Sequence, residues 1–202
     1  MSSINNSNND LSATTTNGET PLFIAAQKGD ATEVRLLLEA NADPSTARTD
    51  IGVTPVYIAA EKGHADVLGL LLEANANPSA ARTDIGVTPV YIAAQKGHAD
   101  VLALLLGANA DPSSARTDNG VAPVWIAAEQ GHADVLALLL EAKADPSAAT
   151  TNNGQTPVFI AALKRDADVI KLLLEAKADP SAATTDIGAT PVYIAAQNGH
   201  AE

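Results

Sequence analysis

A period of 34 residues governs the whole chain and constrains its fold more than any other feature. The same local phrase recurs at this step around each of six prolines, Pro21, Pro55, Pro89, Pro123, Pro157 and Pro191. Residues 54–68 read TPVYIAAEKGHADVL and residues 88–102 read TPVYIAAQKGHADVL, a single difference. Self-similarity at a fixed step indicates a repeat array, in which each unit packs only on its neighbours and all units share one apolar core.

Each unit carries the signals of two short helices. In the second unit, Thr54 is a hydroxyl N-cap and Pro55 suits the first helical turn, which predicts a helix start. Gly63 supplies the left-handed residue that ends this helix after about two turns. Valine and leucine then recur at spacings of three and four, which predicts a second helix ending near Asn75. Helices this short are marginal alone, so stacking must stabilise them.

A loop rich in turn-forming residues follows each helix pair. Residues 78–88 read PSAARTDIGVT, and we expect them to form a hairpin-like finger that projects from the helices. Every first helix also contains an Ala-Ala pair, such as Ala59 and Ala60, whose small side chains allow close helix packing. One unit is therefore predicted to be a helix, a turn, a second helix and a long finger.

The repeated phrase resembles a known family. Its consensus, G-x-T-P-V-Y-I-A-A-x-x-G-H-A-D-V-L-x-L-L-L-E-A-x-A-D, is similar to the ankyrin repeat. Tetratricopeptide units share the period of 34 residues, but they spend nearly all of it on two longer helices and lack a finger rich in turn formers. The resemblance runs from about residue 10 to residue 202. It implies an all-α, ankyrin-type helix-turn-helix repeat solenoid with projecting finger loops.

The resemblance also sets the expected domain organisation. We expect residues 10–202 to form one ankyrin repeat array of five full repeats and a sixth truncated after its first helix. Residues 1–9 are Ser- and Asn-rich without an apolar core pattern, and we expect a disordered tail. Glu33 and Arg35 replace less polar residues of the second unit, which suits an N-terminal cap. A chain that stops inside a repeat is expected to be a fragment or to leave an apolar stripe uncovered.

Three departures from the family pattern carry structural expectations. An aromatic residue replaces the family's histidine in all six units, at Phe23, Tyr57, Tyr91, Trp125, Phe159 and Tyr193. Lys143 and Lys177 replace the residue that ends the second helix in left-handed conformation, so these helices should end less tightly. Arg165 replaces a terminating glycine, so the first turn of its unit should be strained or reshaped.

The sequence offers no constellation for catalysis or for a bound metal or cofactor. Matching positions of successive units lie about 10 Å apart, too far for the four histidines, His64, His98, His132 and His200, to share one zinc ion. We interpret each histidine as bonding the backbone at its own turn. Asp30 and Asp166 fill the same position, so the role should not require imidazole. Near-perfect translation also disfavours the convergence of different residues that an active site needs, and we expect no enzyme activity and no cofactor.

Composition restricts the expected partners. The chain has 24 acidic and 12 basic residues and a formal net charge of −12, which repels nucleic acid and anionic membranes. It has no cysteine, no leader-like N-terminus and no apolar run approaching the roughly 18 residues that span a bilayer. We therefore expect a cytoplasmic, soluble monomer, with end-to-end association at the truncated C-terminal face as the alternative to a monomer.

The resemblance implies a non-catalytic protein–protein interaction module that binds a partner protein through the concave face of fingers and first helices. The alternative is a structural spacer or scaffold segment of a larger protein, with no dedicated binding site. The candidate protein-binding residues on the concave face are Arg48, Arg82, Arg116, Trp125, Tyr57, Tyr91, Lys62 and Lys96.

Two of these sets have a structural interpretation beside the binding one. The three arginines either form exposed ion pairs between units with Asp50, Asp84 and Asp118, or present a basic stripe to an acidic partner segment. The aromatic rings either pack between fingers as spacers or, at Trp125 above all, provide a binding hot spot.

Overall fold

Paired helices and projecting loops alternate along residues 14–199, the part of the chain that a computed structural model describes. The first helices are α1 (Pro21–Lys28), α3 (Pro55–Lys62), α5 (Pro89–Lys96), α7 (Pro123–Gln130), α9 (Pro157–Lys164) and α11 (Pro191–Gln197). The second helices are α2 (Ala31–Glu39), α4 (Ala65–Glu73), α6 (Ala99–Gly107), α8 (Ala133–Glu141) and α10 (Ala167–Glu175). Residues 1–9, for which we expect disorder, and His200 lie outside the described residues.

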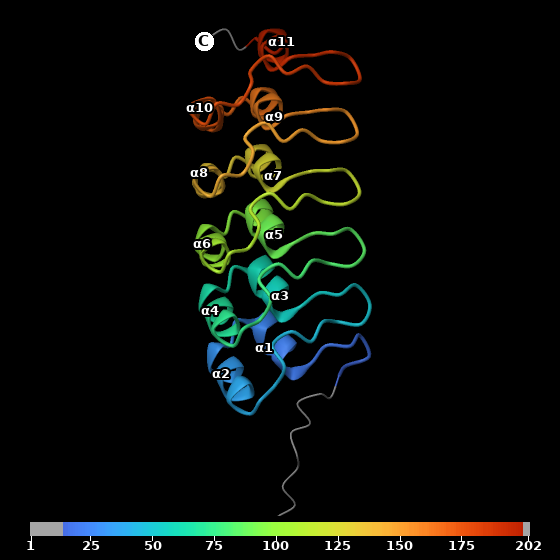
Figure 1. Cartoon of the computed structure of the whole chain (residues 1–202), viewed down its shortest axis with the longest axis vertical. Coiled ribbons are helices and arrows are strands. Elements are labelled where there is room, and N and C mark those ends of the chain that lie inside the picture. Colours follow the sequence, from blue (N-terminus) through green and yellow to red (C-terminus); the bar gives the residue numbers. More distant parts are fainter. Residues whose placement is uncertain (1–13, 200–202) are drawn as a thin grey trace, which may run out of the picture.

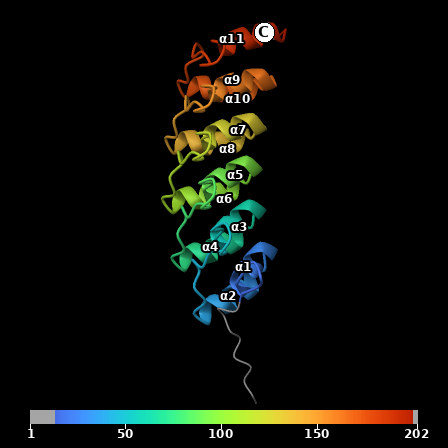
Figure 2. The ribbon, with the colours of Figure 1, turned by 90° about the vertical axis from the view of Figure 1, so that its right-hand side faces the viewer.

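The helices form two parallel columns, and the fingers project from the column of first helices, away from the second helices (Figure 1). Each helix packs on its pair and on its counterparts in the neighbouring units, so the units follow one another in an elongated stack (Figure 2). The predicted all-α helix-turn-helix solenoid with finger loops is confirmed. Within residues 14–199, every helix is too short to cross a lipid bilayer.

The first helices begin and end at the residues that the local signals predict. Thr54 Oγ1 accepts a hydrogen bond from the Tyr57 N–H at 3.2 Å, and Gly63 closes the helix at φ 76°. Other units repeat this cap with their own threonine, but Ala122 replaces it before α7, where no side-chain cap is formed. The first helix of the Trp125 unit therefore begins without the hydrogen bond that threonine supplies elsewhere.

The lysines that follow α8 and α10 do not loosen the helix ends, so that expectation was wrong. Lys143 adopts φ 70°, and its N–H donates to the Leu140 carbonyl at 3.0 Å. Asn109, at the corresponding place after α6, donates to Leu106 at the same 3.0 Å. The two ends have the same geometry, because the terminal hydrogen bonds use backbone atoms that do not depend on the side chain.

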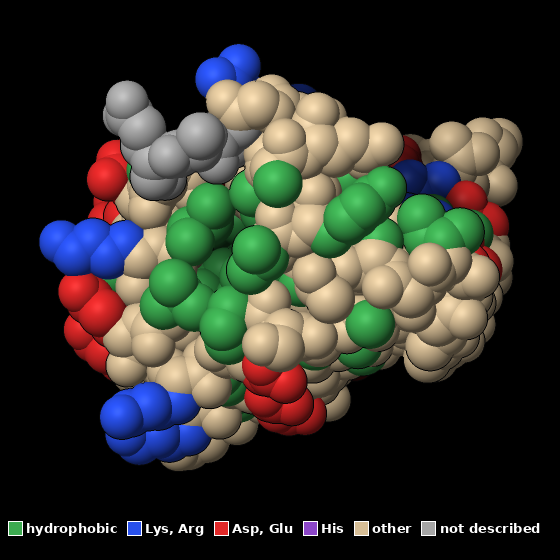
Figure 3. Space-filling model, turned by 90° about the horizontal axis from the view of Figure 1, so that it is seen from above, with side chains coloured by type: hydrophobic (Ala, Val, Ile, Leu, Met, Phe, Trp, Pro, Cys, Tyr) green, Lys and Arg blue, Asp and Glu red, His purple; other side chains and the backbone are tan. Residues whose placement is uncertain are grey.

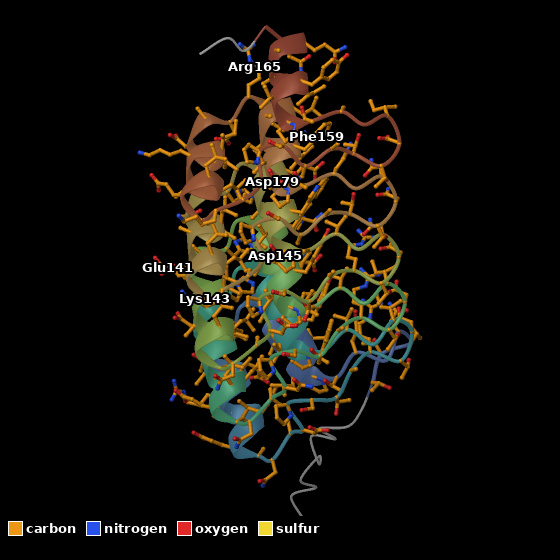
Figure 4. All side chains as sticks on the ribbon, turned by 45° about the horizontal axis from the view of Figure 1, so that its top comes forward. Glu141, Lys143, Asp145, Phe159, Arg165 and Asp179 are labelled. Atoms are coloured by element: carbon orange, nitrogen blue, oxygen red, sulfur yellow. The ribbon has the colours of Figure 1, made fainter. Side chains whose placement is uncertain are left out.

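Arg165 takes the left-handed conformation of the glycine that it replaces, with φ 67°. Of the two expectations for this turn, strain applies, because a left-handed arginine costs roughly 1–2 kcal/mol and the turn keeps its shape. Figure 4 shows Arg165 at the end of α9 far from the fingers and Phe159 toward the finger side.

One apolar core runs along the stack between the two columns. The Ala-Ala pairs lie at its centre, with Ala59 and Ala60 fully buried, and Leu68 and Leu71 of α4 are fully buried beside them. Equivalent residues continue the core from α1 to α10. By contrast, Glu33 and Arg35 at the first unit are exposed, as residues of an N-terminal cap should be.

The fingers are hairpins joined to one another by backbone hydrogen bonds. In the finger between α2 and α3, the Arg48 N–H donates to the Val53 carbonyl at 2.9 Å and the Gly52 N–H donates to the Arg48 carbonyl at 3.1 Å. The next finger is joined to it because the Thr83 N–H donates to the Ile51 carbonyl at 3.0 Å. The same link recurs at Thr117, Thr151 and Thr185.

The threonine that makes this link also packs over a glycine of the preceding finger. Gly52 has φ 69°, and a Cβ atom on it would lie 2.6 Å from Thr83 Cγ2. Gly86 has φ 66°, and its Cβ would lie 2.5 Å from Thr117 Cγ2. Glycine is therefore required twice at these positions, by the backbone conformation and by the approach of the next finger.

The histidines bind the preceding unit rather than their own turn, which corrects the sequence interpretation. His64 Nε2 lies 3.2 Å from the Gln27 carbonyl oxygen, 37 residues earlier, and the ring packs over Gly29. His98 and His132 make the same contact with Glu61 and Gln95. They do so because the translation places each ring directly above the helix end of the unit before it.

The aspartates at the histidine position have a different role. Asp30 Oδ1 accepts from the Glu33 N–H at 3.0 Å, and Asp166 Oδ1 accepts from the Val169 N–H at 3.0 Å. Each carboxylate therefore caps its own second helix, whereas the imidazole joins two units. The expectation that the two residue types are interchangeable here was wrong.

Three alanine substitutions test the double requirement at the finger glycines. We expect Gly86→Ala to lower the free energy of unfolding by about 2–4 kcal/mol, through left-handed strain and the clash with Thr117 together. Gly188→Ala, with φ 66° and no atom within 4 Å, should cost only the strain of about 1–2 kcal/mol. Gly69→Ala, inside α4 and also without a neighbour within 4 Å, should stabilise by about 0.5–1 kcal/mol.

Urea unfolding followed by circular dichroism measures all three changes. Equal costs for Gly86→Ala and Gly188→Ala would contradict the packing part of the requirement, and a cost for Gly69→Ala would contradict the whole comparison.

Candidate functional site

The fingers and the first helices form one continuous side of the stack, and the second helices form the other (Figures 1 and 2). We call the first of these the finger face. It consists of residues 43–53 and their counterparts in later units, together with the odd-numbered helices. All eight candidate binding residues of the sequence lie on the finger face.

The arginines pair with aspartates inside their own finger, so the expected Arg–Asp pairing between units was wrong. Arg48 does reach a carboxylate of the preceding unit, because its Nη1 lies 3.5 Å from Glu19 Oε1. Arg82 Nε donates to Asp84 Oδ1 at 3.1 Å, and its Nη2 donates to Asp84 Oδ2 at 2.7 Å. Arg116 pairs with Asp118 through the same two nitrogens, whereas Arg48 donates to Asp50 through Nη2 alone, at 2.6 Å. The hydrogen bonds from Arg82 hold the pKa of Asp84 below its usual value. These pairs form because the hairpin places both side chains on one side of the finger.

The same guanidinium groups contact the preceding unit through its aromatic ring. Arg48 Cζ lies 5.8 Å from the centre of the Phe23 ring, and Arg116 Cζ lies 6.0 Å from the centre of the Tyr91 ring. These distances are those of cation–π contacts. Because all three guanidinium groups are paired with a carboxylate, and those of Arg48 and Arg116 also lie over a ring, the arginines do not form a stripe of unpaired charge.

The rings of the candidate site are buried in the free protein. Tyr57 is 3% exposed, Tyr91 is 2% exposed and Trp125 is 8% exposed. Burial raises the pKa of the Tyr57 phenol, and the neighbouring Arg82 guanidinium partly opposes this rise. This environment fits the interpretation of the rings as spacers between fingers. A direct contact between any of these rings and a partner stays a prediction.

Lys62 and Lys96 lie at the exposed ends of α3 and α5. The Lys62 side chain is 46% exposed, and its Nζ lies 3.9 Å from Glu61 Oε2, a contact that water screens strongly. Among the eight candidates, the two lysines are thus the ones that the free protein leaves exposed.

A hollow that the sequence did not reveal opens beside Trp125. It has a volume of about 270 Å³ and is bordered by Trp125 on α7, Glu129 one turn later, and Thr150 of the following finger. Trp125 Nε1 is buried there, and no hydrogen-bond partner for it exists among the described residues. One signal in the sequence could have revealed the hollow. The fingers that follow the two buried tyrosines carry arginine and aspartate, whereas the finger that follows Trp125 carries Thr150 and Asn152 at these places.

A second exposed feature lies at the C-terminal end of the stack. Val192 and Tyr193 of α11 are 64% and 55% exposed, and Ile187 in the last finger is 78% exposed. Figure 3 shows apolar side chains gathered on this end of the molecule. We call these three residues the end face.

Within residues 14–199, no three His, Asp or Glu side chains gather in the arrangement that a metal ion needs.

Stacked pairs of short helices with hairpin fingers on one side define a helical-repeat solenoid of the finger-bearing type. A family model described as "Ankyrin repeats (3 copies)" matches residues 2–82, 75–150 and 146–202, and the chain belongs to the ankyrin repeat family. Ankyrin repeats generally mediate contacts between proteins, and the family is typically non-enzymatic. A comparison with curated proteins gave no match.

The burial of Trp125 can be tested by truncation. We expect Trp125→Ala to lower the free energy of unfolding by about 3–5 kcal/mol, because it removes a buried indole ring from between two units. Tyr193→Ala is the matched control, since Tyr193 occupies the same place in its unit but is 55% exposed, and its cost should be well below 1 kcal/mol. Urea unfolding measures both. Similar costs for the two variants would show that the ring of Trp125 does not stabilise the stack.

Proposed function

We propose that this chain is a non-catalytic interaction module that binds a partner protein along the finger face. The family supplies the general role, and the finger face supplies a long, regular surface for it. The more specific statement, that the partner meets the fingers and first helices rather than the second helices, is our inference from the geometry described above.

The finger face is held in place by bonds between units. Neighbouring fingers share a backbone hydrogen bond at each step, as in the bond of 3.1 Å from the Thr117 N–H to the Ile85 carbonyl. Guanidinium groups such as that of Arg116 join a finger to the ring of the unit before it. A surface fixed in this way loses little conformational entropy when a partner binds, which favours affinity.

The observation that carries the proposal is the variation at the exposed ends of the first helices, beside buried alanines that do not vary. The last two residues of these helices are Gln27 and Lys28, Glu61 and Lys62, Gln95 and Lys96, Glu129 and Gln130, and Leu163 and Lys164. Their net charge changes from unit to unit, while the buried Ala-Ala pair behind them is the same throughout. A partner that lies along the finger face would therefore meet a different side-chain pattern at each unit.

Charge reversal on the two faces tests the proposal. The partner is first isolated with the full chain as bait, and its affinity is then measured with purified proteins by isothermal titration calorimetry. We expect Lys62→Glu with Lys96→Glu to weaken binding at least about tenfold, because both side chains lie on the finger face. Lys171→Glu with Lys177→Glu makes the same change of charge on the second-helix side and should alter affinity less than about twofold.

Two outcomes would contradict the proposal. One is a larger loss in the second-helix variant than in the finger-face variant. The other is equal loss in both, which would show that net charge rather than the finger face governs binding.

We further infer a monomer that associates end to end only at high concentration, through the end face. Exposed apolar area favours association, and Val192, Tyr193 and Ile187 together provide it. Sedimentation equilibrium should show concentration-dependent association that Val192→Ser with Tyr193→Ser abolishes. Association that persists in this variant would place the contact elsewhere.

A further inference from the structure

Along the finger face, a ring from one unit and a guanidinium from the next finger form a repeated contact. Arg48 lies over Phe23 and Arg116 lies over Tyr91 at ring-centre distances of 5.8 and 6.0 Å. Each arginine is also held by the aspartate two residues later. The chain thus shows in its own structure which chemical group packs above a ring at this position of the unit.

At Trp125 the ring is present and the guanidinium is missing. Thr150 stands where the arginine belongs, and Asn152 stands where its aspartate belongs. The Thr150 hydroxyl turns to its own finger, where it donates to Asn153 Oδ1 at 2.6 Å and accepts from the Gln155 N–H at 3.1 Å. This threonine and Trp125 both line the hollow of about 270 Å³. Its volume is below the roughly 300–1,000 Å³ of small-molecule pockets and suits a single side chain.

The lining of the hollow suits a cation with several hydrogen-bond donors. Indole is the aromatic ring that attracts cations most strongly. Glu129 contributes a carboxylate, and Gln155 contributes an amide oxygen that can accept hydrogen bonds. Arg116 also lines the hollow, and its positive charge is balanced by Asp118, to which its Nε donates at 2.9 Å.

We propose that this hollow receives an arginine side chain of the partner protein, whose guanidinium takes the place above Trp125 that the chain's own arginines take above Phe23 and Tyr91. The inference rests on the proposed function, because the hollow lies on the finger face, and it names the chemistry of one contact there. Arginine fits better than lysine because its planar group can stack on the ring while its five N–H donors reach the surrounding oxygens.

The probes are three blocked pentapeptides that carry arginine, citrulline or lysine between pairs of glycines. Citrulline keeps the shape of arginine without its charge. Trp125 is the only tryptophan of the chain, so its indole N–H gives a single resonance in a ¹H–¹⁵N spectrum of the full protein. We expect the arginine peptide to shift this resonance saturably and to bind at least about tenfold more tightly than the citrulline and lysine peptides.

Two variants locate the binding. Thr150→Arg with Asn152→Asp restores the arginine and aspartate of the other fingers, so its own guanidinium should fill the hollow and abolish the response to the arginine peptide. Thr184→Arg adds an arginine at the equivalent place above Phe159, one unit away, and should leave the response of Trp125 unchanged. Thermal unfolding of both variants confirms that each is folded before titration.

The proposal is overturned if the arginine peptide causes no saturable shift, or if citrulline or lysine binds as tightly as arginine. It is equally overturned if the response survives in the Thr150→Arg and Asn152→Asp variant. None of these outcomes bears on the finger face as a whole, because the peptides contain no partner sequence. Conversely, a partner found to bind the second-helix side would contradict the proposed function, but the binding of the arginine peptide at Trp125 could still be measured.

Discussion

Packing of side chains over left-handed glycines of the preceding unit is the contact on which the stack depends. On the turn side, His64 lies over Gly29 and bonds the helix end beside it. On the finger side, Thr83 lies over Gly52 while its N–H bonds the neighbouring finger. No Cβ atom fits at either glycine, so the same residues that end a helix or turn a hairpin also make room for the next unit. Local structure and cohesion between units are therefore set by the same positions.

This arrangement changes at the unit that contains α9 and α10, and the change bears on function. Asp166 Oδ1 caps its own helix, so the imidazole-to-carbonyl contact of the earlier joints is replaced there, although Asp166 Oδ2 still packs over Gly131 of the preceding unit, 3.0 Å from where a Cβ atom would lie. In the finger before α9, Thr150 leaves Trp125 without a guanidinium above it. The joint between the fourth and fifth units thus lacks two of the contacts that the earlier joints share. It is also where the finger face is hollowed, which is why a ligand group is expected there.

The sequence predicted the features that depend on residues close to one another in the chain. Thr54, Pro55 and Gly63 set the bounds of α3, because a cap, a fixed φ and a left-handed residue act locally. It could not predict contacts between units, since periodicity does not say which neighbour a side chain meets. His64 was therefore assigned to its own turn, and Arg82 was paired with an aspartate of another finger. The hollow was missed for the same reason: the loss at Thr150 matters only beside a ring of the unit before it.

A double-mutant cycle on Gly63 and His98 tests the central claim most directly, because the two residues belong to successive units and a Cβ on Gly63 would lie 2.8 Å from His98 Cε1. In the wild-type background, Gly63→Ala should cost both left-handed strain and the clash with the ring. In the His98→Ala background the clash is gone, and the cost in unfolding free energy should be smaller by about 1 kcal/mol or more. An equal cost in both backgrounds would show that the histidine of one unit does not pack on the glycine of the unit before it, and the account of the stack would be wrong.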